Sequence, residues 1–230
     1  MRTLAAAWRT VQRHRLLKHL GESPLRAFLA APRPSMRTCC RDSELVAIDL
    51  ETTGLNPKHD RILSVGLVIV QGTAIPLDTA AHYLVQPKQS IPESSAVIHG
   101  ITDDTAADGA PLGEVVAQVL ALLRGRILLA HNARIELAFL SQACRRLCGG
   151  PLLISSVDTQ ILAQRRLEQR QTSLRAGDLR LHALRSRFGL PQYPAHNALS
   201  DALAAAELYL ALINDGDDPA KRRIADVLTG

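Results

Sequence analysis

Two carboxylates stand inside a short apolar run, in the segment VAIDLE at 46–51. The residues around them have the composition of a strand buried in the middle of a sheet. Asp49 and Glu51 are two positions apart, so a strand directs both side chains to the same face. Acids buried side by side repel, and one takes up a proton unless a cation lies between them. The segment therefore predicts a central strand with a cation site, the alternative being a strand whose acids face solvent.

The pattern of the chain beyond residue 44 predicts a mixed sheet. With 230 residues and 47% hydrophobic content, the chain is long enough to bury a full core as one domain. Short β-rich segments with turn residues between them predict an antiparallel meander of three strands at 45–50, 62–70 and 81–85. Helices expected at 115–123, 136–147 and 201–212 alternate with strands expected at 127–130 and 152–157. This alternation predicts parallel strands added to the meander, so the expected fold class is α/β, a central sheet flanked by helices.

A second acidic position lies near the end of the chain, in the segment HNALSDA at 196–202. Asp201 opens an Ala-rich stretch with high helix propensity, and His196 lies in the loop before it. An imidazole in such a loop titrates near neutral pH, which suits a general base. Taken alone, His196 is an ordinary loop histidine and Asp201 an acid that complements a helix dipole. Together with Asp49 and Glu51 they predict a hydrolytic metal site.

Three separated segments, VAIDLETTG at 46–54, HNARIE at 131–136 and HNALSDA at 196–202, resemble the motifs of the DEDDh family of 3′-to-5′ exonucleases, the DnaQ-like group. That family includes the proofreading subunit of bacterial replicative DNA polymerase. The resemblance spans about residues 44 to 213. It implies a ribonuclease H-like fold with two divalent cations, Mg²⁺ or Mn²⁺. It also implies hydrolysis of phosphodiester bonds at 3′ ends of single-stranded DNA or RNA, with release of nucleoside 5′-monophosphates.

The resemblance also implies roles for individual residues. Asp49, Glu51 and Asp201 would hold the first metal, with Asp49 bridging to the second, toward which Glu136 points. His196 would take a proton from the attacking water. The residues implied in substrate binding are Thr52, Thr53, Gly54, His99 and Asn132. For His99, in the segment IHGIT at 98–102, a plain turn followed by a helix cap from Thr102 is an equally good interpretation.

Glu136 departs from the pattern, because the second motif of the family usually ends in Asp. Its side chain is one methylene longer, whereas Mg²⁺ demands near-ideal octahedral distances. Residues 126–157 contain no other carboxylate, so either Glu136 serves, through a water or a shifted helix, or that ligand is missing. Asp158 is expected to cap a helix that begins near Gln160. If the altered motif abolished turnover, the chain would be a non-catalytic nucleic-acid-binding or scaffold module.

The positive charge of the chain is concentrated at its beginning. Residues 1–41 contain nine Lys or Arg and one acid, a balance of +8, whereas the whole chain is +5 and the remainder therefore −3. We expect residues 1–43 to form a basic, partly helical arm and linker, 44–215 the exonuclease domain, and 216–230 a tail or short helix. Such an arm could attract nucleic acid, an acidic partner or an anionic membrane, or be a solvated helical extension.

Localisation and partners are expected from the same composition. The chain lacks an apolar run long enough to span a bilayer and has few cysteines, which predicts a cytoplasmic protein. Its Arg-rich, acid-poor beginning also resembles a mitochondrial presequence. The expected partner is nucleic acid with a free 3′ end, and a DNA polymerase or repair complex is a further partner class. Five arginines between 165 and 180 could line a phosphate track or form a solvated face.

Overall fold

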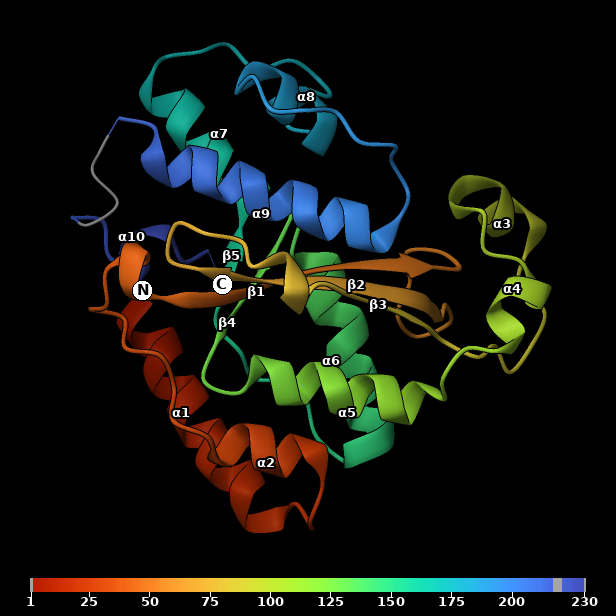
Figure 1. Ribbon diagram of the computed structural model, residues 1–230. Coiled ribbons are helices and arrows are strands. Elements are labelled where there is room, and N and C mark those ends of the chain that lie inside the picture. The colour runs from red at the N-terminus through yellow and green to blue at the C-terminus, as the bar shows by residue number, and fades with distance from the viewer. Residues whose placement is uncertain (1, 217–220, 230) are drawn as a thin grey trace.

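The computed structural model describes residues 2–216 and 221–229. Its five-stranded sheet has the order β3-β2-β1-β4-β5, with β1 (Glu44–Thr52) at the centre (Figure 1). β2 (Ile62–Gln71) is antiparallel to β1 and to β3 (Ala81–Leu84), whereas β4 (Ile127–Ala130) and β5 (Ser156–Asp158) add in parallel. The predicted mixed sheet, an antiparallel meander extended by parallel strands, is confirmed.

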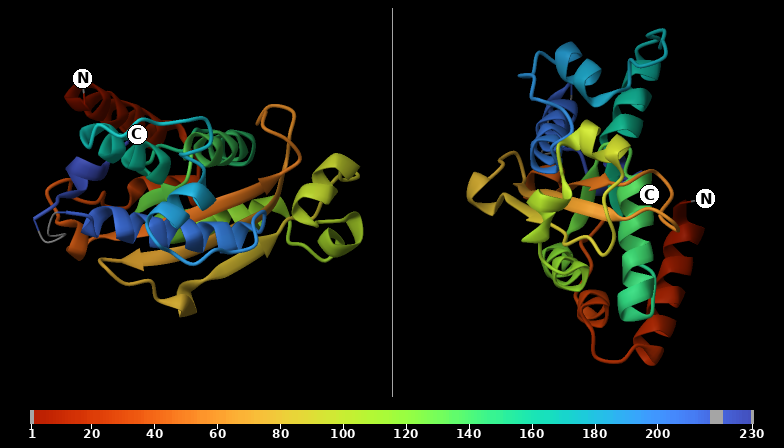
Figure 2. Two further views of the ribbon diagram at one scale, coloured as in Figure 1. Left: turned by 90° about the horizontal axis from the view of Figure 1, so that it is seen from above. Right: turned by 90° about the vertical axis from the view of Figure 1, so that its right-hand side faces the viewer.

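Helices cover both faces of this sheet (Figures 1 and 2). One face packs on α2 (Pro24–Ala30), α5 (Leu112–Leu123) and α6 (Arg134–Cys148), and the other on α7 (Thr159–Gln169), α9 (Ala198–Asn214) and α10 (Ile224–Val227). Successive residues of β1 alternate between these two cores: Val46 and Ile48 face the first, Leu45 and Ala47 the second. Both faces of β1 are thus covered, as its apolar run predicts.

The basic beginning of the chain is a helical hairpin packed on the first core. It consists of α1 (Arg2–His19) and α2, joined at 20–23. Each helix supplies an arginine to the carboxyl end of the other: Arg13 donates to the carbonyls of Leu29 and Ala31, and Arg26 to those of Leu17 and Leu20. These bonds satisfy carbonyls that have no partner within their own helix. Apolar side chains of α2 complete the docking, because Leu25, Phe28 and Leu29 are buried in the core.

Two stretches differ from the sequence-based prediction. The strand expected at 152–157 is reduced to β5, because the preceding apolar side chains Leu153 and Ile154 pack against the first core instead of continuing the ladder. Two short helices follow β3: α3 (Glu93–His99), which was not expected, and α4 (Asp103–Ala107), which begins directly after Thr102. Thr102 caps α4 through a reciprocal pair of hydrogen bonds with Thr105, as the cap interpretation of 98–102 predicts.

The last described residues return to the sheet. After α10, the Thr229 N–H donates to the Ser156 carbonyl at 3.0 Å, and the Thr229 hydroxyl accepts the Asp158 N–H at 2.8 Å. Arg223 forms an isolated bridge with Cys39 on the segment that leads into β1. The last described segment therefore lies between β5 and the residues that lead into β1. Within the described ranges, each helix is too short or too polar to cross a membrane. One more helix, α8 (Leu181–Arg187), lies between α7 and α9 in the chain.

Candidate active site

Three of the predicted acids converge at the carboxyl-terminal half of β1. Asp49 and Glu51 project from the same side of the strand, and Asp201 reaches them from the first turn of α9. One carboxylate oxygen from each lies within 4.8 Å of the others. Glu51 is buried, and Asp49 and Asp201 are partly exposed. Oxygen ligands in this arrangement suit a hard divalent cation.

A glycine in β2 makes this convergence possible. Gly66 pairs with Asp49 in the antiparallel ladder, and the amino end of α9 lies directly on it. A β-carbon at Gly66 would fall 2.0 Å from the Ala198 carbonyl carbon, which is far inside contact distance. Without Gly66, α9 and the Asp201 that it carries would have to move away from β1. Sequence analysis missed this residue, although an isolated glycine in a strand pattern signals a close backbone approach.

The acids are electrostatically unfavourable toward one another when no cation balances them. Burial, and then the charges of Glu136, Asp201 and Glu51, raise the pKa of Asp49 well above its ordinary value. Burial and the charge of Asp201 raise the pKa of Glu51 to about 7, and burial raises the pKa of Asp201. A bound cation would reverse the repulsion between these groups. The charge arrangement therefore fits the metal site that the sequence predicts.

Glu136 faces the same cluster from α6 and is 3% exposed, so it is not an exposed helix acid. Burial raises its pKa to about 8, and its charge raises the pKa of Asp49. Its Oε2 atom has no hydrogen-bond partner among the described residues. A buried carboxylate oxygen without a partner is costly and calls for an unseen one. Glu136 stands outside the tight group of three oxygens, although its charge acts on Asp49.

Asp158 holds the turn that leads to Glu136. Its carboxylate accepts the N–H groups of Asn132 and Ala133 at 3.0 and 2.9 Å, and it caps α7 by accepting from Gln160 and Ile161. The predicted cap is therefore confirmed, and the same side chain also fixes the β4–α6 turn. Asn132 sits in that turn with a left-handed φ of 64°. The backbone of Asn132, whose side chain is predicted to contact substrate, is thus held by Asp158 just before α6 begins.

His196 and His99 both lie beside residues of the acidic cluster. His196 is exposed, has a left-handed φ of 66°, and donates its backbone N–H to the Asp201 carboxylate at 2.9 Å. His99, at the end of α3, contacts the Thr52 carbonyl through Nε2 at 3.2 Å. Burial lowers the pKa of His99, and the nearby charge of His196 lowers it further. The structure thus brings both histidines to the cluster from segments far apart in sequence.

The loop after β1 is fixed by Asp60. Thr53 donates through its hydroxyl to Asp60 at 3.2 Å, and Gly54 approaches the same carboxylate so closely that a β-carbon would lie 2.5 Å from it. Thr52 donates its hydroxyl to the Gly54 carbonyl at 2.7 Å. Thr52, Thr53 and Gly54 therefore form a tight turn beside Glu51, where a nucleotide could approach the backbone.

A buried arginine supports the loop that carries His196. Arg185 donates to the Pro191 carbonyl, to the Ala204 carbonyl at 2.8 Å and to the Glu207 carboxylate at 2.7 Å. Its guanidinium also lies 4.5 Å from the centre of the Tyr193 ring. Tyr193 in turn donates to Glu207 at 2.8 Å. Sequence analysis did not single out these three residues, because their spacing carries no recognisable motif.

The expected arginine track is divided by the structure. Arg166 and Arg170 pair with Asp215, away from the acids. Arg180 instead lines the hollow that contains Asp49, Asp201 and His196, together with His131 and His182. Arg180 is therefore placed where it could meet a phosphate next to the acidic cluster.

Comparison with known proteins agrees with this geometry. The protein-family model described as "RNase_T: Exonuclease" matches residues 46–209, which include all four acids and His196. The chain belongs to this exonuclease family. The DNA polymerase III subunit epsilon of Treponema pallidum is 32% identical over 73% of this chain and 75% of its own length. The PolC-type DNA polymerase III of Thermotoga maritima is also 32% identical over 75% of this chain, which spans only 12% of that relative.

Solved exonuclease structures share the fold. The nuclease domain of 3′hExo, a DEDDh family member bound to rAMP, has a TM-score of 0.64 at 17% identity and covers 76% of this chain and 94% of its own. E. coli ExoI in its zinc-bound complex with single-stranded DNA has a TM-score of 0.66 at 18% identity and covers 76% of this chain and 41% of its own. The predicted ribonuclease H-like fold, the DnaQ-like resemblance and the assignment as a nuclease are confirmed.

Proposed function

We propose that this exonuclease removes nucleotides one at a time from the 3′ end of a single-stranded nucleic acid and releases nucleoside 5′-monophosphates. The observation that carries the proposal is the convergence of Asp49 and Glu51 from β1 with Asp201 from α9. Carboxylate oxygens gathered in this way are the ligands that hard divalent cations prefer. The names of the relatives, a DNA polymerase III subunit and a PolC-type polymerase, support DNA as the substrate and a polymerase as partner.

The residues fit two divalent cations, Mg²⁺ or Mn²⁺. Asp49, Glu51 and Asp201 would hold one, and Asp49 with Glu136 the other. The partnerless Oε2 atom of buried Glu136 and the mutual repulsion of the acids support this assignment. When bound, such cations activate water and stabilise the charge that develops on the phosphate oxygens and the leaving 3′ oxygen.

The chain's own residues would supply positioning and proton transfer. His196 would act as the general base, because its loop joins the cluster directly and its ring is open to solvent. The turn at Thr52, Thr53 and Gly54 would receive the terminal nucleotide, with His99 beside it. Asn132 would contact the same nucleotide from the start of α6.

The deciding experiment is a cleavage assay on matched single strands of DNA and RNA that carry the label at either end. We expect stepwise shortening from the 3′ end with Mg²⁺ or Mn²⁺ and none in excess chelator. Asp49→Asn and Asp201→Asn should abolish cleavage, since each removes a ligand and its charge. Asp104→Asn, which changes an exposed carboxylate of α4, is the matched control and should behave as wild type.

Three results would contradict the proposal. Turnover in excess chelator would exclude the cation mechanism, and shortening from the 5′ end would reverse the direction. Binding of both strands without cleavage in either metal would favour the alternative of a non-catalytic nucleic-acid-binding module.

A further inference from the structure

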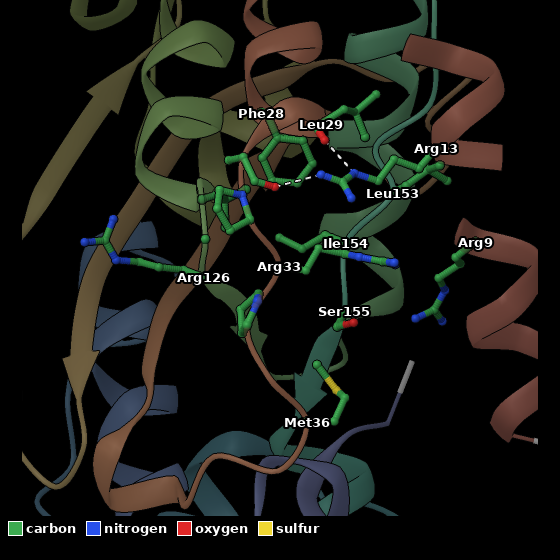
Figure 3. A pocket seen from close by; sticks show the side chains of 15 residues that line it. Arg9, Arg13, Phe28, Leu29, Arg33, Met36, Arg126, Leu153, Ile154 and Ser155 are labelled. Carbon is green, nitrogen blue, oxygen red and sulfur yellow. Dashed lines mark hydrogen bonds between the residues drawn. The ribbon is translucent and has the colours of Figure 1, made fainter. Parts of the chain in front are cut away.

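A second hollow lies away from the acidic cluster, between α1, the segment 32–36 and the residues that precede β5 (Figure 3). Its volume is about 40 Å³. One water molecule needs about 10–15 Å³ by the same measure, so the hollow has room for a group of several heavy atoms. It is too small for a nucleobase with its sugar.

The lining of this hollow is basic and contains no carboxylate. Arg9 and Arg13 reach it from α1 and Arg33 from the segment after α2. In Figure 3 the guanidinium groups of Arg9 and Arg33 face one another across it. Arg126 also lines it, but its charge is already balanced by Glu44 at 2.7 Å. The positive charges of Arg9, Arg13 and Arg33 therefore have no acidic partner within the lining.

These arginines retain free donors. Arg13 uses Nε and one terminal nitrogen for the carbonyls at the end of α2, and Arg33 uses one nitrogen for the Thr10 hydroxyl at 2.9 Å. Arg9 makes no hydrogen bond within the described part of the chain. The rest of the wall is largely apolar, with Phe28 and Ile154 among its residues. The guanidinium nitrogens that are not used in these bonds have no protein acceptor among the described residues.

The repulsion among these positive charges makes the binding of an anion in the hollow favourable. Arg13 is held in place by the helix end that it caps, and the charge of Arg33, after burial, lowers its pKa. An arginine nevertheless stays protonated in proteins. An anion between the groups would replace repulsion by charge-assisted hydrogen bonds, and guanidinium matches the oxygens of a phosphate particularly well.

We propose that this hollow is a binding site for a terminal or free phosphate group, held by Arg9 and Arg33 and oriented by Arg13. A monoester phosphate has the two negative charges and the exposed oxygens that a narrow basic recess can surround. An internal phosphodiester carries one charge and two bulky substituents that the recess cannot enclose. The source is either inorganic phosphate or the 5′-phosphate of a nucleotide or oligonucleotide.

The single tryptophan of the chain provides a direct readout. Trp8 adjoins Arg9 on α1 and is 59% exposed, so its fluorescence should respond when an anion draws Arg9 inward. The full-length protein is titrated with inorganic phosphate, 5′-AMP, and one oligonucleotide with either a 5′-phosphate or a 5′-hydroxyl. Excess chelator keeps divalent metal from the acidic cluster, so the result does not depend on nuclease activity.

Three variants define the site. Arg9→Ala and Arg33→Ala should each weaken phosphate binding at least about tenfold, and Arg33→Lys should restore part of the loss because it keeps the charge. Arg15→Ala is the matched control: it removes an exposed arginine of the same helix that does not line the hollow. Melting temperatures of all variants should stay close to wild type, because Arg9 and Arg33 make few structural bonds.

The four ligands identify the source. Binding of inorganic phosphate alone indicates a free-ion site, and binding of 5′-AMP or the 5′-phosphorylated strand indicates a nucleotide terminus; both support the proposal if Arg9→Ala removes them. Equal binding of the 5′-hydroxyl strand would show recognition of the backbone and would overturn it. So would saturation by none of the phosphates, or an Arg15→Ala loss equal to that of Arg9→Ala.

Discussion

Arg185 lies on α8 and Glu207 on α9, and their side chains meet at 2.7 Å with the guanidinium only 2% exposed. The pair joins the helix that carries Asp201 to the loop that carries His196, because Arg185 also donates to the Pro191 carbonyl. Tyr193 completes the arrangement by stacking on the guanidinium and donating to Glu207. Residues outside the three motif segments thus fix the position of the His196 loop relative to the helix that carries Asp201.

Removing the arginine should therefore affect both stability and rate. Arg185→Met removes the donor to Glu207 Oε2 and to the Pro191 and Ala204 carbonyls, and leaves Tyr193 as the donor to Glu207. Breaking a buried pair in this way costs about 3–5 kcal/mol. Tyr193→Phe removes one hydrogen bond, worth about 0.5–1.5 kcal/mol, and should cost much less. Thermal melting and cleavage rates of the two variants test this order. Equal melting temperatures for wild type and Arg185→Met would show that the Arg185–Glu207 pair does not stabilise the fold.

His196 should control the rate. If its ring takes the proton from water, His196→Ala should slow cleavage by about 10² to 10⁴. Rates are measured under single turnover. A variant within twofold of wild type would assign the proton transfer to another group.

Glu136 should make the enzyme sensitive to the metal supplied. The longer side chain fits the strict geometry of Mg²⁺ less well than that of Asp would, and Mn²⁺ is expected to tolerate it better. We expect faster cleavage with Mn²⁺, unchanged or improved Mg²⁺ activity in Glu136→Asp, and a severe loss in Glu136→Ala. Rates of the three forms in each metal provide the test. If Glu136→Ala equals wild type in both, this buried acid takes no part in the site.

The metal-free protein should become less stable as pH rises. The folded-state pKa values of Glu51, about 7, and Glu136, about 8, lie above the ordinary 4.5. The folded state therefore holds more protons than the unfolded state between about pH 4.5 and 8, and the stability that is present below pH 4.5 is lost across that interval. We expect the melting temperature in chelator to fall by several degrees from pH 5 to pH 8. Added Mn²⁺ should reverse the fall, and Glu136→Gln should reduce it; a flat profile in chelator would contradict the mutual repulsion of these acids.

The amino-terminal hairpin should be needed for folding. Leu25 and Leu29 are 0% and 2% exposed in the first core, and Leu→Ala changes at such sites cost about 2–5 kcal/mol. Val11→Ala on the exposed face of α1, where 51% of the residue is accessible, should stay within about 0.5 kcal/mol of wild type. Chemical denaturation measures both. A Leu25→Ala protein as stable as Val11→Ala would mean that the hairpin is dispensable.

Hydrophobic periodicity and motif residues predicted those parts of the fold that are determined by local sequence. The alternating burial of β1, the meander, and the cluster of Asp49, Glu51 and Asp201 follow from side-chain direction and from acids in an apolar strand. Charge alone suggested a separate arm at the beginning, whereas Leu25 and Phe28 pack into the core. That docking depends on which distant surface receives them, and composition does not contain this information. The need for a glycine at position 66 was likewise not predictable, because it depends on the packing of α9 against β2.

Thr229 occupies the Ser156 carbonyl and the Asp158 N–H of β5, which is an edge strand of the sheet. An uncovered border strand offers its free amide and carbonyl groups to strands of other molecules and so seeds aggregation. Thr229 therefore protects the edge of the sheet from pairing with another molecule, although it takes no part in the acidic cluster. A chain shortened before Thr229 would keep every acid of the cluster and yet tend to associate with itself, so its loss from solution would imitate a loss of activity.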